Sequence, residues 1–325
     1  MQMQVVLERL GFAPGVIDGK IGISTKNALA GFQEANGLAE TGEVDDATRA
    51  GLAKWSNIPA TRVVKIPDDW GKIAYRPMPE KAEDQAKMDS LGYETLDEKL
   101  AERFHTTVDV LRMLNPGGRP AAQGQSAPAT PATPTSASPS PSVPVAQFKA
   151  GQTIRVPNIG ADQLDPSEID NKGWLATLRS LGVGSAQPDV AKIVVDKSSG
   201  WLKGYDAQEK LVAMFTVTTG SHRDPLPIGN WGINGISFNP DFAYNPELFW
   251  DVPDSTEKQR LPPGPNGPVG VAWIDLTKDH YGIHGTGAPE TIGRAQSHGC
   301  VRLTNWDVAR LAEMISGKTK VIFQE

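Results

Sequence analysis

The sequence predicts a chain of several domains: a small helical unit, a mixed unit of helices and strands, and a mainly β C-terminal unit with one late helix. Three observations predict this order. Helical apolar stripes separated by turn signals occupy residues 1–56. A stretch rich in proline, alanine, serine and threonine interrupts residues 61–160. Runs rich in β-forming residues fill residues 188–325.

The composition excludes some classes of protein. Hydrophobic residues make up 39% of the 325 residues, which is enough for packed cores. The net charge is −6 and no basic run occurs, so nucleic acid is not an expected partner. No apolar run approaches the ~20 residues needed to span a bilayer, so we expect no membrane span. Met1 leads straight into an amphipathic segment, so we expect that no signal peptide is present in this chain.

The first unit, residues 1–56, carries three predicted helices. Gly11 ends the first helix, and Ser24 or Thr25 is expected to cap the second. The apolar positions are Val5, Val6, Leu7 and Leu10 in the first helix, Ala28, Leu29 and Phe32 in the second, and Val44 and Leu52 in the third, which also carries Thr48. The turn signals Pro14-Gly15, Asp18-Gly19 and Thr41-Gly42 separate these helices.

The middle unit, residues 61–160, contains two predicted helices and a closing strand. The helices carry Leu96, Leu100 and Phe104, and then Val110, Leu111 and Leu114. Residues 119–146 hold seven prolines and one charge, a composition that cannot bury a core. We therefore expect a disordered or extended linker there, with the character of a flexible tether. Residues 148–157 then form a short strand.

The C-terminal unit, residues 188–325, is expected to be an all-β sandwich or barrel with one helix. Its β-rich runs cover residues 193–195, 211–217, 269–276 and 320–323. The helix opens at Asn305, which we expect to cap it, and Gly317 closes it. Residues 234–268 form a long loop rich in aromatic residues, which predicts a lid or a binding wall.

The only cysteine of the chain, Cys300, lies in a segment suited to chemistry. The segment reads His284-Gly285-Thr286, ten residues, and Ser297-His298-Gly299-Cys300-Val301-Arg302. A lone cysteine is more often a small buried apolar residue than a nucleophile. Two of the five histidines and several glycines flank this one, and a neighbouring imidazole can convert the thiol to a thiolate. Catalysis is therefore the favoured interpretation.

The same motif closely resembles the signature H-G-T…S-H-G-C-[VI]-R of the YkuD-type L,D-transpeptidases. The similarity extends from about Ala191 to Ile322 and includes Gly220, Pro227-Ile228-Gly229 and the closing helix and strand. It implies a YkuD-like, mainly antiparallel β fold whose sheet cradles the cysteine segment. It also implies that the loop over the active site holds the peptide stem of the substrate.

The two preceding units resemble wall-binding modules. The series L-x-x-L-G-F-x-P-G-x-I-D-G, Phe32-Gln33, Gly37-Leu38 and T-G-x-x-D in residues 7–45 looks like the three-helix peptidoglycan-binding type 1 domain. Residues 95–157 are similar to a LysM module, which has two helices between two strands and binds the wall glycan. This copy is degenerate, because Tyr93-Glu94 replaces the usual Gly-Asp before Thr95-Leu96 and the linker splits it.

The resemblance implies roles for the motif residues. Cys300 would be the nucleophile and His284 the base, and the Gly285 carbonyl would orient the imidazole. The backbone N–H groups of His298, Gly299 and Cys300 would form the oxyanion hole. Ser297 and Arg302 would support the loop, and Arg302 is also open to pairing with a substrate carboxylate.

Spacing alone leaves His298 open as a competing base, because residues two apart in an extended segment point to the same side. His105, His222 and His280 match no motif, and we expect surface or polar core positions for them. His280 and His284 lie four apart in a predicted strand, and no carboxylate completes a zinc site. We therefore expect neither a metal ion nor another cofactor.

These features predict an exported L,D-transpeptidase of the periplasm or cell envelope that forms 3→3 cross-links between peptidoglycan stem peptides. Carbapenems would inactivate it by acylating the cysteine. Water or a lipoprotein lysine as the acceptor would instead make it an L,D-carboxypeptidase or an anchoring enzyme. A wall-binding scaffold with an inactive catalytic domain is the alternative without catalysis. A sortase-like transpeptidase is disfavoured because its T-L-x-T-C context is absent.

Overall fold

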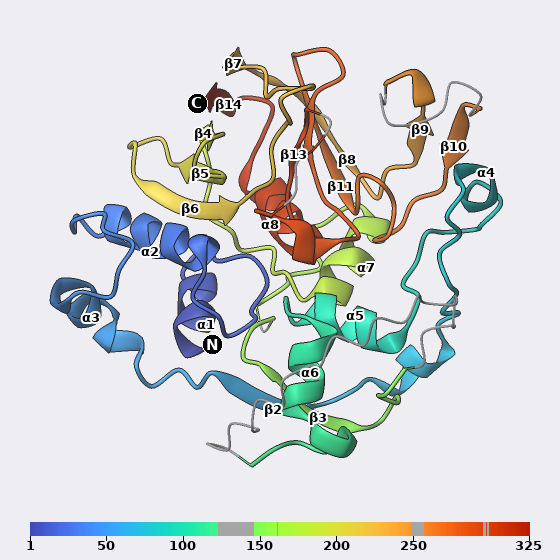
Figure 1. The fold of residues 1–325 in the computed structure, drawn as a ribbon, viewed down its shortest axis with the longest axis horizontal. Coiled ribbons are helices and arrows are strands. Elements are labelled where there is room, and N and C mark those ends of the chain that lie inside the picture. Colours follow the sequence, from blue (N-terminus) through green and yellow to red (C-terminus); the bar gives the residue numbers. More distant parts are fainter. Residues whose placement is uncertain (123–145, 161, 249–256, 295–296, 298) are drawn as a thin grey trace.

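The structure is a computed structural model that describes residues 1–122, 146–160, 162–248, 257–294, 297 and 299–325. It contains a helical first unit, a middle unit of helices and two strands, and a larger β-rich unit (Figure 1). Within these described residues, no helix combines the length and the apolar character that are needed to cross a membrane.

The first unit holds the three helices that the apolar stripes predict. These are α1 (Gln2–Arg9), α2 (Ile23–Ala35) and α3 (Asp46–Leu52), followed by the short η1 (Ala53–Trp55). Asp45 caps α3, because its side chain accepts a hydrogen bond from the Thr48 N–H. The expected cap of α2 was wrong: Gly22 is its N-cap, and Ser24 and Thr25 lie inside its first turn.

The middle unit has an antiparallel strand pair with two helices between its strands in the sequence. Strand β2 (Thr61–Lys65) pairs with β3 (Thr153–Pro157). Helices α5 (Leu96–Arg103) and α6 (Val108–Leu114) pack on this pair around a core that includes Leu100. Shorter elements are η2 (Asp68–Lys72), α4 (Ala82–Gln85) and η3 (Pro116–Gly118). Apart from the short α4, this strand–helix–helix–strand order is the one that the LysM resemblance implies, while LysM membership stays a prediction.

The proline-rich segment does not join two separate units. Residues 123–145 lie outside the described residues, but the chain on both sides of them belongs to the middle unit. The Ala121 N–H donates to the Leu114 carbonyl at 3.0 Å, and the Gln147 N–H donates to Asp97 Oδ2 at 2.9 Å. The segment therefore begins and ends in the middle unit, the unit to which its residue numbers assign it.

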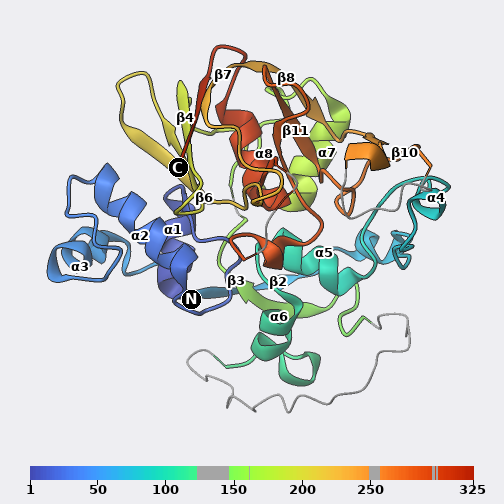
Figure 2. The same ribbon diagram turned by 45° about the horizontal axis from the view of Figure 1, so that its top comes forward.

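The C-terminal unit contains two main sheets around one core. The six-stranded sheet has the order β1-β6-β5-β4-β14-β7, in which β1 (Phe12–Ala13) comes from the first unit, and the four-stranded sheet has the order β13-β12-β11-β8. Helix α8 (Asn305–Met314) lies between them (Figure 2). The strands are β4 (Lys192–Asp196), β5 (Trp201–Tyr205), β6 (Leu211–Thr216), β7 (Gly229–Trp231), β8 (Ile233–Phe238), β11 (Ala272–Leu276), β12 (Gly282–His284), β13 (Val301–Arg302) and β14 (Lys320–Gln324).

The expected aromatic loop contains a small hairpin beside the main sheets. Strand β9 (Phe242–Tyr244) pairs with β10 (Gln259–Leu261), and η4 (Pro246–Leu248) follows β9. Phe249 and Trp250 lie outside the described residues. The chain after β10 is held by the middle unit, because the Leu91 N–H donates to the Pro263 carbonyl at 3.0 Å.

Helix α7 (Lys172–Leu181) of the C-terminal unit was not predicted from the sequence. It precedes the first β-rich run and is capped by Asn171. Its Trp174 is buried in the core of the C-terminal unit and stacks on Phe238 with ring centroids 4.5 Å apart. The packed C-terminal unit thus begins before residue 188.

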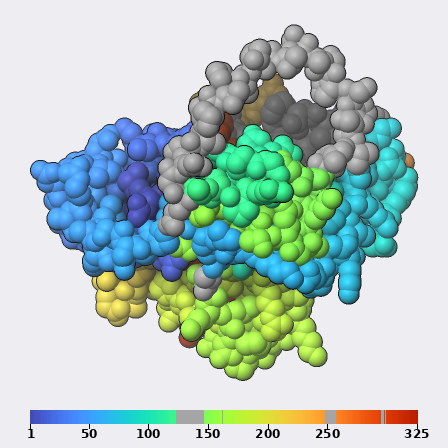
Figure 3. Space-filling model, turned by 90° about the horizontal axis from the view of Figure 1, so that it is seen from below, coloured from blue at the N-terminus to red at the C-terminus, as the bar shows by residue number. Residues whose placement is uncertain are grey.

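The first unit is joined to the C-terminal unit by strand pairing as well as by apolar contact. Strand β1 (Phe12–Ala13) pairs in parallel with β6, and the Met214 N–H donates to the Gly11 carbonyl at 2.8 Å. Leu7, Phe32 and Met214 share one hydrophobic core. Figure 3 shows that the first and middle units lie side by side across this face of the molecule, with part of the C-terminal unit below them.

Candidate active site

Two short parallel strands bring the halves of the motif together. In the pairing of β12 with β13, Ile283 lies opposite Val301 and His284 lies opposite Arg302. Residues in register point to the same side of a sheet, and side chains alternate along each strand. His284 therefore shares its face of the sheet with Arg302, and Cys300 lies in the turn directly before β13.

His284 is a neutral imidazole, and one of its ring nitrogens makes a hydrogen bond to the backbone. Its side chain is buried, and its Nδ1–H donates to the Gly285 carbonyl at 2.7 Å. The pKa of His284 is lowered to about 4, chiefly by burial; the Gly285 carbonyl opposes this shift and the charge of Arg302 adds to it. Because Nδ1 carries the proton, Nε2 has the lone pair that accepts a proton from a nucleophile.

Cys300 is a protonated thiol in this arrangement. Burial raises the pKa of the thiol, although the Gly282 N–H and Arg302 partly offset that effect. The S–H group points to the His280 carbonyl, 3.8 Å from the sulfur. Since the thiol pKa is raised and the imidazole pKa is lowered, the resting pair is neutral. Proton transfer to the imidazole then has to accompany nucleophilic attack.

The turn before Cys300 is closed by Ser297. Its Oγ donates to the Cys300 carbonyl at 2.6 Å, and its N–H donates to the Thr219 carbonyl at 3.0 Å. Gly299 has a φ of 107°, and a Cβ there would lie 2.7 Å from Tyr281 Cε1. Only glycine meets both conditions without strain.

The predicted site residues thus meet in one place as far as the structure describes them. Cys300, His284, Gly285, Ser297 and Arg302 all belong to the two strands and the turn. His298 lies outside the described residues. The structure therefore does not describe its expected role as an N–H donor of the oxyanion hole or its alternative role as the base.

The comparisons with known proteins concern the C-terminal unit and the first unit. A family model of the L,D-transpeptidase catalytic domain, YkuD, matches residues 191–323. Residues 191–323 are an L,D-transpeptidase catalytic domain of the YkuD family. A second model, described as "Putative peptidoglycan binding domain", matches residues 1–52.

Two curated relatives resemble parts of the chain. "Putative L,D-transpeptidase YkuD" of Bacillus licheniformis is 51% identical over 59 residues, which are 18% of this chain and 36% of the relative. "Putative L,D-transpeptidase YqjB" of Bacillus subtilis is 28% identical over 122 residues, which are 36% of this chain and 61% of that protein. The chain thus spans between about a third and three fifths of the length of these relatives.

Two solved structures also resemble the chain. L,D-transpeptidase 3 from Mycobacterium tuberculosis, in complex with a faropenem-derived adduct, has 18% identity and a TM-score of 0.34, with 42% of this chain and 61% of that chain covered. The catalytic domain of the Enterococcus faecium L,D-transpeptidase has 17% identity and a TM-score of 0.32, with 43% and 99% covered.

Sequence reasoning missed two residues that shape the site of the L,D-transpeptidase domain. Trp273 lies opposite His284 in the pairing of β11 with β12, and its ring stacks on the imidazole with centroids 5.4 Å apart. Tyr281 packs against Gly299 in the cysteine turn. Neither residue belongs to the motif. Only the cross-strand register reveals the first contact, and only the turn geometry reveals the second.

The expected cap of the closing helix of the L,D-transpeptidase domain is also corrected. Thr304 is the N-cap of α8, because its Oγ1 accepts from the Asp307 N–H at 3.0 Å. Asn305 is the first helical residue, and its side chain turns into the core, where Oδ1 accepts from the Val271 N–H at 3.1 Å. Both residues have a favourable cap side chain, so the sequence could not separate them.

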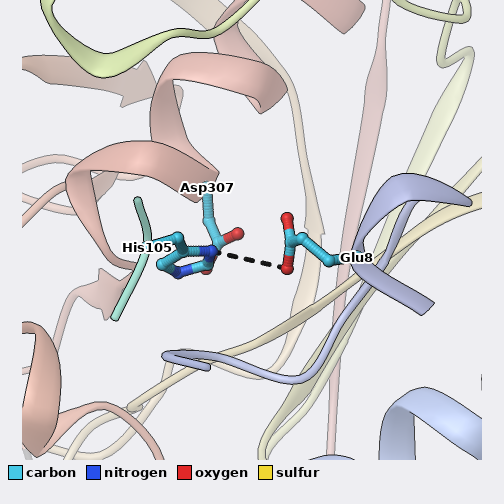
Figure 4. A group of neighbouring side chains, drawn as sticks. All are labelled: Glu8, His105 and Asp307. Atoms are coloured by element: carbon cyan, nitrogen blue, oxygen red, sulfur yellow. Dashed lines mark ion pairs between the residues drawn. The ribbon is translucent and has the colours of Figure 1, made fainter. Parts of the chain in front are cut away.

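One buried group away from the L,D-transpeptidase site has the residue types of a metal site. Glu8, His105 and Asp307 come from three units and point toward one another (Figure 4). Glu8 Oε2 lies 3.4 Å from His105 Nδ1, whereas Asp307 Oδ2 lies 3.6 Å from the opposite nitrogen, Nε2. One metal ion binds one imidazole nitrogen, and Arg310 Nη1 already lies 3.2 Å from Glu8 Oε1. The arrangement therefore fits a protonated imidazole between two carboxyl groups, not a metal ion.

Proposed function

We propose that this chain is a peptidoglycan L,D-transpeptidase that forms 3→3 cross-links through a thioester on Cys300. The observation that carries the proposal is the hydrogen bond from His284 Nδ1 to the Gly285 carbonyl. It leaves the lone pair on Nε2, and the pairing of β12 with β13 brings His284 next to the strand that Cys300 directly precedes. A thiol, an oriented neutral base and a glycine turn with backbone N–H groups are the parts that acyl transfer from an amide requires.

In the first half-reaction, the sulfur of Cys300 attacks the carbonyl carbon of the amide that joins an L-centre to a D-residue in a donor tetrapeptide stem. Meso-diaminopimelate–D-Ala is the proposed bond. The thiol proton passes to His284 Nε2 and then to the departing amine of D-Ala, and a thioester remains. The N–H groups of His298, Gly299 and Cys300 are proposed to hold the oxyanion, each worth about 2.7–4 kcal/mol of barrier.

In the second half-reaction, an amine of another stem attacks the thioester carbonyl. His284 takes the proton of that amine, a new amide forms, and the sulfur leaves and is reprotonated. Water as the acceptor would give an L,D-carboxypeptidase, and a lipoprotein lysine would give an anchoring enzyme. All three reactions use the same acyl-enzyme. Acylation of Cys300 by a carbapenem such as imipenem is proposed for the same reason.

We assign the other units to the wall. The first unit would bind peptidoglycan, and the middle unit would bind glycan if it is a LysM module. The proposed location is therefore the periplasm or cell envelope. Ser297 is proposed to hold the cysteine turn, and Arg302 is proposed to support the loop or to meet a substrate carboxylate.

The test is mass spectrometry of the intact protein with a purified tetrapeptide-containing muropeptide. We expect a thioester adduct on Cys300, release of D-Ala and a cross-linked dimer. Cys300→Ser is the matched control, and we expect it to keep the fold and lose turnover by about 10³-fold or more. A folded Cys300→Ser protein that still forms cross-links would exclude this mechanism. A wild-type protein that binds sacculi without forming an adduct would favour the scaffold alternative.

A further inference from the structure

The side chain of Asn305 links the middle unit to the segment that carries the proposed base. It is fully buried. Its Oδ1 accepts from the Val271 N–H at 3.1 Å, and its Nδ2 donates to the Pro265 carbonyl at 2.9 Å and to Glu102 Oε1 at 2.7 Å. The amide thus has one donor facing its oxygen and two acceptors facing its nitrogen, so only one orientation satisfies all three partners.

Asn305 also packs directly against the backbone that follows His284. A Cβ on Gly285 would overlap Asn305 Oδ1, and a Cβ on Gly270 would overlap the same atom. The amide therefore fills the space beside the Gly285 peptide. The carbonyl of that peptide is the acceptor for His284 Nδ1. A shift of Asn305 has to move the group that orients the imidazole.

Glu102 is the partner of Asn305 that comes from another unit. It lies on α5, outside residues 191–323 of the catalytic domain. Its second oxygen, Oε2, accepts from the Tyr93 hydroxyl, so both oxygens are engaged. Burial raises the pKa of Glu102 to about 7, although the bonds from Tyr93 and Asn305 oppose the rise. A buried acceptor held in this way has little freedom to follow a moving partner.

We propose that Glu102 is a positioning residue for the transpeptidase reaction: it fixes the amide of Asn305 and, through Gly285, the orientation of His284. This inference rests on the proposed function, because it assigns His284 as the base. With this role for Glu102, the middle unit contributes to the geometry of the active site in addition to its proposed binding of the wall. Glu102 touches neither substrate nor sulfur and acts through Asn305 alone.

The inference predicts a specific signature at His284. Without Glu102, the H-G-T segment loosens and water reaches the imidazole, so the pKa of His284 should rise from about 4 toward its ordinary 6.5. Misplacement of a catalytic group by about 1 Å can cost about 10²-fold in rate, and we expect acylation to slow by about 10- to 100-fold. Glu102→Gln keeps a side-chain oxygen as an acceptor for Asn305 Nδ2 and should behave like the wild type.

The experiment compares three variants of the full chain: Glu102→Ala, Glu102→Gln and Glu98→Ala. Glu98 is the matched control, because it lies on the same helix but bonds to Asn266 Nδ2 at 2.7 Å instead of to Asn305. The first measurement is the pKa of His284 from an NMR titration of labelled histidine, assigned by the signal lost in His284→Ala. The second is the rate of imipenem acylation per reactive Cys300, which corrects for any unfolded fraction.

We expect a raised His284 pKa and slow acylation in Glu102→Ala only. An unchanged His284 pKa in a folded Glu102→Ala protein would overturn the inference. Equal defects in Glu102→Gln, or in Glu98→Ala, would also overturn it, since the effect would then come from charge or from general loosening of α5. The NMR measurement needs no substrate. If the wild type forms no muropeptide adduct, the proposed function is excluded, but the pKa of His284 can still be compared between the variants.

Discussion

His105 Nδ1 lies 3.4 Å from Glu8 Oε2, and this contact joins the middle unit to the first helix inside the protein. The opposite nitrogen of His105 faces Asp307 on α8, so one imidazole connects three units. Burial disfavours the imidazolium, but Asp307 and Glu8 outweigh it and raise the pKa of His105. His105 Nδ1, Glu8 Oε2 and Asp307 Oδ1 make no hydrogen bond of ordinary length. Thr304 Oγ1 lies 3.2 Å from His105 Nε2 and donates to Asp307 Oδ2 at 2.9 Å, so attraction between charges and hydrogen bonds through Thr304 together hold the cluster.

The stability of the protein should therefore depend on pH through this cluster. The raised pKa of His105 gives stabilisation that is complete below about 6.5 and is lost as pH rises through the folded value. Burial raises the pKa of Asp307 to about 6, so its contribution also falls as pH rises. For Glu8, burial opposes ionisation, but His105 and Arg310 lower the pKa. Its contribution is lost only as pH falls below about 4.5.

We expect the free energy of unfolding of the wild type to decline as pH rises above about 6.5. His105→Gln should be less stable by about 3–5 kcal/mol at pH 6, the usual cost of breaking a buried ion pair, and should show a flatter decline. Urea unfolding at several pH values measures both effects, with the exposed His222→Gln as control. Parallel pH curves for the wild type and His105→Gln would contradict the assignment of a protonated His105.

The rate of acylation should depend on pH through His284. The base works only when it is neutral, so activity should be lost as pH falls through about 4 and should stay level between pH 5 and pH 8. Because the resting pair is neutral, His284→Ala should slow imipenem acylation but hardly change the reaction of Cys300 with iodoacetamide at pH 7. An acid limb that disappears in His298→Gln and persists in His284→Gln would reassign the base.

A fragment that starts near Pro188 should be unstable. It lacks β1, which pairs with β6, and it lacks the core residues Leu7 and Trp174. Each lost buried side chain removes about 1.5–3 kcal/mol. We expect a lower melting temperature and slower acylation than in the full chain. Replacing residues 123–145 by a glycine–serine segment of equal length is the control and should leave both values unchanged. A fragment with full activity and a normal melting temperature would contradict this prediction, because the catalytic domain would then fold and act without the preceding units.

Binding to sacculi should depend on the exposed apolar side chains of the first unit. Ile21 is 69% exposed and Ile23 is 66% exposed at the start of α2. These side chains do not contribute to the core, and exposed apolar side chains of this kind can pack against the apolar face of a sugar ring. Ile21→Ser with Ile23→Ser should reduce retention in a pull-down with insoluble peptidoglycan and leave imipenem acylation unchanged. Val63→Ser, an exposed apolar position on β2, is the control. Equal retention of all three proteins would place the binding surface elsewhere.

The sequence by itself determined the features that are local in the chain. The family of residues 191–323, the catalytic motif and the three helices of the first unit depend on spacing and turn residues, which a linear pattern carries. It also pointed to Gly285 as the partner of the imidazole, through the resemblance. It could not separate Thr304 from Asn305 at the start of α8, because both residues cap helices well.

Only the tertiary structure decided how the units and the site depend on one another. The stacking of Trp273 on His284 follows from strand register, and the contact of Glu102 with Asn305 joins residues that are distant in the sequence. The protonation of Cys300 and His284 depends on burial, which is a property of all the surrounding elements together. A linear pattern reports which residues alternate and where the chain turns. It does not report which distant surfaces exclude water from a given side chain, and that exclusion sets both the pKa values and the packing here.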